Sequence, residues 1–131
     1  MKVILSWTNS CGGPATGGSV ETACWESTRC HLVKLEKQSG TLCLDVVDAP
    51  NPGPVSMQVI AESGKYVITI LQAIERDTFV RTYTNPSATA EMVEVLGDRW
   101  DARQLTRDFD LVLNLFKMFS ETGDVPAALL S

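Results

Sequence analysis

Histidine is the scarcest functional residue in this sequence, since His31 is the only one among 131 residues. A Ser–His–acid triad would have to use His31, and no G-x-S-x-G motif is present to supply its serine. One nucleophilic pairing stays open, because Cys11 lies in a glycine-rich segment that could reach His31 in the folded chain. With so few groups for proton transfer, we expect a protein that is not an enzyme.

Positive charge is also in short supply. The chain has 11 Lys and Arg against 16 Asp and Glu, which gives a formal net charge of −5 at pH 7. A nucleic-acid-binding domain needs a basic surface that displaces counterions from phosphates. We therefore expect no nucleic-acid partner.

Long apolar runs are absent. No stretch approaches the roughly 20 residues that a membrane span requires, so no membrane partner is expected. The first residues, MKVILSWTNS, have one lysine and an apolar run that is too short for a signal peptide. We interpret this run as a strand and expect a cytoplasmic protein.

The four cysteines show no C-x-x-C spacing; they are Cys11, Cys24, Cys30 and Cys43. A structural zinc site needs close pairs of Cys or His ligands. His31 directly follows Cys30, and neighbouring residues of a strand point to opposite faces. We expect no metal, no cofactor and no disulfide framework, and we expect the thiols to be reduced and buried.

The glycine-rich segment CGGPATGGS at 11–19 lacks a basic residue. Compared with the phosphate-binding pattern G-x-x-x-x-G-K-[ST], Gly12, Gly17 and Ser19 fall in register. Gly18 occupies the lysine position, and no Lys or Arg occurs between Thr8 and Glu26. The pattern therefore predicts a flexible connection, with an incidental anion at the following helix as an alternative.

Strand and turn signals dominate the rest of the chain. Ser19 is a plausible N-cap for a short helix over about 20–28. Two-residue turns at Ser39-Gly40, Ser63-Gly64 and Gly97-Asp98 predict three hairpins. The strands of these hairpins are predicted at 30–37 with 41–47, 55–61 with 66–71, and 91–96 with 99–105. A further strand is predicted at 78–84. NPGP at 51–54 has two prolines and is not expected within an inner strand.

The clearest helix lies near the C-terminus. Its apolar residues recur at helical spacing as Phe109, Val112, Leu113, Phe116 and Phe119. Thr106 is the expected N-cap, and Gly123 with Pro126 ends the helix. The sequence predicts an α+β fold in a single domain, 1–131. It consists of an antiparallel β-meander sheet of about 6–8 strands, a short helix after the first strand, and the C-terminal helix on one face.

An acidic segment carries the best candidate for a partner-binding site. It combines negative charge with a tryptophan, and its candidate residues are Glu94, Asp98, Trp100 and Asp101. An exposed tryptophan among charges is typical of an interface, whereas packing inward beside Ala102 is the alternative. Acidic residues would speed association with a basic partner.

The segment GDRWDARQLTRDFDLVLNLFKMFSETGDVP, an acidic hairpin followed by a Thr-led helix, carries a resemblance. Together with the opening strand, the short helix and the hairpins, it resembles the small immunity proteins of bacterial polymorphic-toxin and contact-dependent inhibition systems. The resemblance implies a cytosolic, acidic α+β domain that binds one cognate toxin domain and blocks it without catalysis. Two alternatives stay open: a small enzyme or ligand-binding protein using the loop around Cys11, and a structural subunit of a homo-oligomer. In the second, the tail Ala127–Leu130 would make the contact. The protein itself is expected to be a monomer or a homodimer.

Overall fold

The computed structural model describes residues 2–10, 13–22 and 24–131. These residues form nine strands, two α-helices and two short 3-10 helices. Their order along the chain is β1 (Val3–Ser10), β2 (Thr16–Thr22), α1 (Trp25–Leu32), η1 (Val33–Glu36), β3 (Ser39–Val46), β4 (Gly53–Glu62), β5 (Lys65–Ile74), β6 (Asp77–Thr82), β7 (Met92–Val95), β8 (Asp98–Asp101), η2 (Ala102–Gln104), β9 (Leu105–Thr106) and α2 (Phe109–Thr122).

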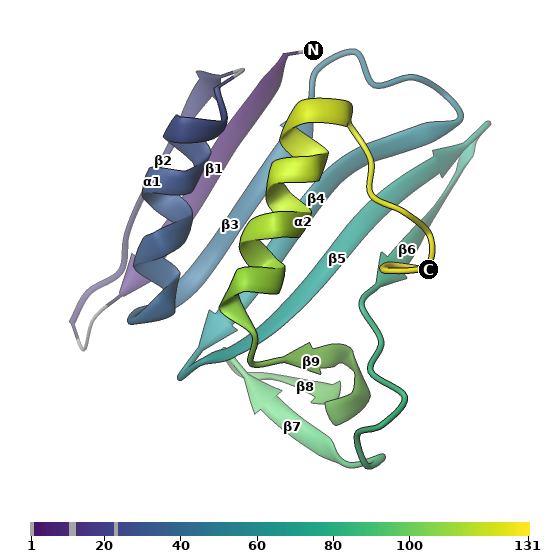
Figure 1. Ribbon diagram of the computed structural model, residues 1–131. Coiled ribbons are helices and arrows are strands. Elements are labelled where there is room, and N and C mark those ends of the chain that lie inside the picture. Colours follow the sequence, from purple (N-terminus) through teal and green to yellow (C-terminus); the bar gives the residue numbers. More distant parts are fainter. Residues whose placement is uncertain (1, 11–12, 23) are drawn as a thin grey trace.

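Seven of these strands form one antiparallel sheet, in the order β2-β1-β3-β4-β5-β6, with β9 paired to β5. The strands β7 and β8 form a separate hairpin (Figure 1). The α+β fold with an antiparallel sheet is therefore confirmed. No helix in the described ranges has both the length and the apolar character needed to cross a membrane.

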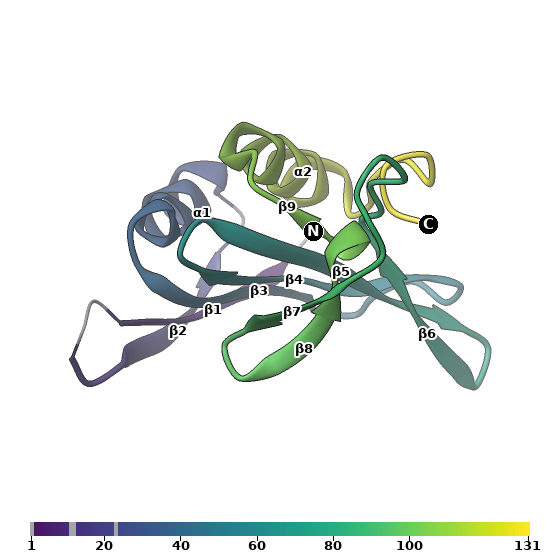
Figure 2. The ribbon, with the colours of Figure 1, turned by 90° about the horizontal axis from the view of Figure 1, so that it is seen from below.

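Both α-helices cover the same face of the sheet (Figure 2). The core lies between these helices and the sheet. Phe116 and Phe119 of α2 are fully buried there with Leu44, Met57 and Ile70 of the strands. Burial of each such side chain contributes about 1.5–3 kcal/mol, so this layer is a main source of stability.

The C-terminal helix was predicted with its end at Gly123, which adopts a left-handed φ of 81°. Its N-cap is Asp108 instead of Thr106, because the Asp108 side chain accepts from the Leu111 N–H.

The hairpin of β4 and β5 is confirmed around Ser63 and Gly64. Both residues have positive φ values, 52° and 75°, which are those of a type I′ turn. In the hairpin of β7 and β8 the turn lies one residue earlier than predicted. Leu96 and Gly97 occupy it, with Val95 paired to Asp98. Leu96 adopts a φ of 51°, so the turn is also type I′ and not type II′.

The short helix of the predicted fold is present, but its bounds and the neighbouring elements differ from the prediction for residues 16–37. Segment 16–22 is strand β2, in which Ser19 lies opposite Ser6 of β1 and caps no helix. The helix begins at Trp25 instead, after β2, and η1 extends it to Glu36. No hairpin therefore exists around Ser39-Gly40, although the second predicted strand, 41–47, corresponds to β3.

Pro54 lies within β4, which is an inner strand, contrary to the expectation for the NPGP segment. The proline is tolerated because β3 pairs with β4 only from Ser56 to Ala61, so β4 has no partner on its β3 side at Pro54. On the β5 side, the pairing of β4 with β5 shifts its register between Pro54 and Ser56.

Candidate functional site

The four residues predicted to bind a partner all lie in the β7–β8 hairpin, but they do not share one face. Residues in a strand alternate between faces, so Val93, Val95, Asp98 and Trp100 lie on one side. Glu94 and Asp101 lie on the other side. Val95 is fully buried, which shows that its side faces the body of the molecule. The structure therefore separates Trp100 from Glu94 and Asp101.

Trp100 is half-buried, and its Nε1 is buried with no hydrogen-bond partner among the described residues. It lies directly opposite Val93. A buried indole N–H normally finds an acceptor, so this donor is notable. The geometry matches the inward-packing alternative for Trp100 more closely than an exposed anchor.

The charges of the hairpin are partly compensated. Arg103 donates to both carboxylate oxygens of Asp101, at 3.0 and 2.6 Å, and its backbone N–H donates at 2.9 Å. These hydrogen bonds hold the pKa of Asp101 at about 2, below its ordinary 3.8. Glu94 lies opposite Arg99, and its backbone oxygen accepts from Lys65 Nζ at 3.0 Å.

The hairpin lies against the sheet face that the helices leave uncovered, at one end of that face (Figure 2). Val67 of β5 points to this face and is fully buried together with Val95. Both residues lie outside the main core cluster. At the hairpin tip, Leu96 shares a small surface pocket with Thr8 and Gly40.

The rest of that sheet face is uncovered, and we call it the open face. Two adjacent cross-strand rows make it up. The first row, from β1 to β6, is Ile4, Asp45, Ser56, Leu71 and Val80; the second is Ser6, Cys43, Gln58, Thr69 and Thr82.

Three of the first-row side chains are large, apolar and accessible: Ile4 is 38%, Leu71 36% and Val80 59% exposed. This face was not predicted from the sequence, because the predicted sheet had a role for only one of its faces. The alternation in β1, β3 and β5 was the available signal.

Asp45 is the acidic group within the first row. Its Oδ2 accepts a long contact of 3.7 Å from the Cys43 thiol, two residues earlier on the same face. Burial, followed by the charge of Asp45, raises the pKa of Cys43 to about 12. The thiol therefore stays protonated at neutral pH and is a poor nucleophile.

Cys11, the cysteine of the predicted Cys–His pair, lies outside the described residues. The segment around Cys11 joins β1 to β2 and precedes no helix. His31 lies on α1 and stacks on Trp7, with ring centroids 3.7 Å apart. Within the described ranges, no group of three or more His, Cys, Asp or Glu is arranged to hold a metal ion.

The tail that could have joined two subunits contacts its own chain. Leu130 is fully buried and forms a β-bridge with Tyr83, whereas Ala127 and Ala128 are exposed.

The fold defines an α+β protein with two helices on one face of an antiparallel sheet. A solved structure with this fold is the crystal structure of a hypothetical protein from Neisseria gonorrhoeae, with a TM-score of 0.77 and 16% sequence identity over 93% of this chain and 90% of that one. Residues 11–129 match the family described as Family of unknown function (DUF6911), and the chain belongs to that family. No curated protein matches the chain.

Proposed function

We propose that this chain is a non-enzymatic protein-binding module of the cytoplasm, and that it binds and neutralises a cognate bacterial toxin domain as an immunity protein. The single observation that supports this proposal is the open face. A sheet face that carries three exposed large apolar side chains in one row is typical of a contact surface.

The open face offers a mostly neutral surface. Its second row consists of Ser, Cys, Gln and two Thr side chains, which contact a partner without the cost of desolvating charges. The exposed apolar residues Ile4, Leu71 and Val80 would supply the area that determines the residence time.

Charge supports a basic partner. Asp45 lies between Ile4 and Ser56 in the first row, and no basic side chain belongs to either row. Nearby, Glu21 of β2 lies opposite Ile4 and pairs with Lys2, with 3.6 Å between Lys2 Nζ and Glu21 Oε1. A lysine or arginine of the partner would reach Asp45, and the net charge of −5 would speed its approach.

The experiment is a growth-protection assay with the toxin domain encoded beside this gene, supported by calorimetry with the purified proteins. We expect the wild-type chain to restore growth and to bind the domain directly. Leu71→Glu and Val80→Glu, which place charge in the open face, should each abolish protection and weaken binding by tenfold or more, or about 1.4 kcal/mol.

Met118→Glu is the matched control, because Met118 is 37% exposed on α2, on the other side of the sheet. It should protect as well as the wild type. Equal binding by all three variants would show that the open face is not the contact. A neighbouring domain that is not toxic, or that this chain does not bind, would contradict the immunity function itself.

A further inference from the structure

A cavity of about 650 Å³ lies away from the open face and the hairpin. One wall consists of Pro50 and Pro52, in the segment between β3 and β4, and Pro54 at the start of β4. The other wall is the C-terminal end of α2 with Asp124, which follows the helix, and Gln72 of β5 also contributes. Volume and apolar walls of this kind are typical of small-molecule sites.

Arg81 orients two of the polar side chains that line the cavity, Gln72 and Asp124. Its Nη1 donates to Gln72 Oε1 at 3.2 Å and to Asp124 Oδ1 at 2.8 Å. The guanidinium itself is buried, with its side chain 9% exposed, and it also donates to the backbone oxygens of Leu130 and Val125. Asp124 Oδ1 accepts from the Val125 N–H as well. Because Oδ1 is fully engaged while the Asp124 side chain is 52% exposed, the second carboxylate oxygen is available to a ligand.

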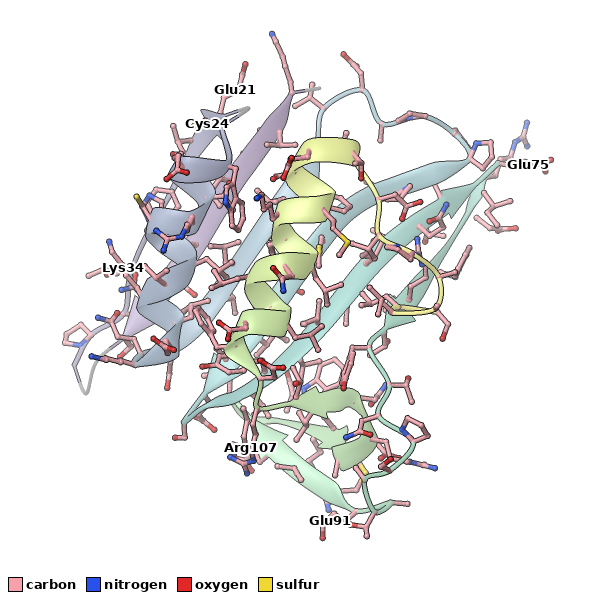
Figure 3. The ribbon with its side chains drawn as sticks, viewed as in Figure 1. Glu21, Cys24, Lys34, Glu75, Glu91 and Arg107 are labelled. Carbon is pink, nitrogen blue, oxygen red and sulfur yellow. The ribbon has the colours of Figure 1, made fainter. Side chains whose placement is uncertain are left out.

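Hydrogen bonds between the Asn51 side chain and the Glu75 backbone hold the proline-rich wall in place. Asn51 donates to the backbone oxygen of Glu75 at 2.6 Å and accepts from its N–H at 2.8 Å. These bonds attach the wall to the turn between β5 and β6, where Glu75 lies at the corner of the sheet (Figure 3). At Gly53 a Cβ would lie 2.7 Å from the Pro50 oxygen, so the loop closes tightly there. A wall fixed in advance lowers the entropy cost of binding a ligand.

The charge of the cavity favours a cation. Asp48 and Asp124 line it, and Arg81 compensates only one of these two charges. The C-terminal end of α2, at Thr122 and Gly123, adds the negative end of the helix dipole. We propose that this cavity binds a small organic cation, an ammonium or amidinium group attached to an apolar body. The charged group lies against Asp48 and Asp124, and the body packs on the prolines.

Binding of benzamidine, followed by two-dimensional NMR of the labelled full chain, tests this proposal. Benzamide, which is neutral, and benzoate, which is an anion, have nearly the same shape and serve as matched probes. We expect saturable shifts of the Gly53, Gln72, Gly123 and Asp124 amides with benzamidine, and at least about fivefold weaker binding of both other probes.

Two variants test whether binding depends on the negative charge of Asp48 and on the volume of the cavity. Asp48→Asn should weaken benzamidine binding about fivefold, and asparagine tolerates the φ of 56° found at this position. Val47→Trp should fill the cavity and remove binding. Asp77→Asn, an exposed residue of β6 outside the cavity, is the control and should bind as the wild type does. Equal binding of the three probes, shifts outside the cavity, or no shifts at millimolar benzamidine would overturn the proposal.

Discussion

At the scale of single residues, the ring of His31 stacks on the ring of Trp7. The two rings are 3.7 Å apart at an interplanar angle of 25°, and His31 Nδ1 is buried with no hydrogen-bond partner among the described residues. Burial, and next the nearby charge of Lys34, lowers the pKa of His31 below 6.5. The folded protein therefore favours the neutral imidazole.

This preference predicts a loss of stability in mild acid. Above pH 6.5 the imidazole is neutral in both states, so the full stability is present. As the pH falls below that value, the unfolded chain takes up a proton before the folded one does, and the free energy of unfolding decreases. Urea denaturation between pH 7.5 and 5.5 measures the effect. His31→Phe keeps an aromatic ring on Trp7 and should show a flatter profile; an identical slope in this variant would assign the effect to other groups.

At the scale of elements, β2 shows where sequence patterns stop being informative. It is an edge strand whose described side chains are all exposed, so it carries no alternation of apolar and polar residues. Gly17 and Gly18 suggest a loop, yet Gly18 lies across from Trp7 in the register of β1 and β2. Segment 16–22 is a strand because it pairs with β1, and the strand propensities of its own residues do not determine this.

The close approach of Gly18 to Trp7 predicts that a side chain here is harmful. A Cβ at Gly18 would lie 2.9 Å from an atom of the Trp7 ring, which is closer than ordinary contact. Gly18→Ala should therefore displace the indole from His31 and destabilise the fold by about 1–3 kcal/mol, measured by urea denaturation. Gly13→Ala is the control, because nothing lies within 4 Å of its Cβ, and it should change stability by less than about 0.5 kcal/mol. Similar losses in both variants would contradict this reading of the contact.

Helix α2 is the opposite case and explains what the sequence could predict. Its apolar residues face one buried layer, so their helical spacing is visible without any knowledge of the partner strands. The candidate site was predicted less well for a related reason. The turn lies one residue earlier than predicted, at Leu96 and Gly97, which changes the cross-strand partners, so that Trp100 lies opposite Val93. Which side of the hairpin faces the body of the molecule depends on its contact with the sheet, and the local sequence pattern does not determine that contact.

At the scale of the whole molecule, Arg81 connects parts that are distant in the sequence. From β6 it donates to the Leu130 oxygen at 3.1 Å, to the Val125 oxygen at 2.9 Å and to Asp124. The Thr82 N–H donates to the Ser131 oxygen beside it. The C-terminal tail is thereby fixed along the edge of the sheet that an unpaired β6 would otherwise expose to another chain.

Arg81→Lys should therefore release the tail while keeping the charge. A lysine ammonium cannot reproduce the planar fork that serves these separate acceptors, so backbone oxygens lose their donors. We expect a loss of about 1.5–3 kcal/mol in the free energy of unfolding and faster hydrogen exchange in 124–131. Arg103→Lys alters the Asp101–Arg103 pair, in which the Arg103 side chain is 47% exposed, and should lower the free energy of unfolding less than Arg81→Lys does. If both substitutions cost the same and exchange in the tail is unchanged, Leu130 and its apolar burial, not Arg81, hold the tail on the sheet.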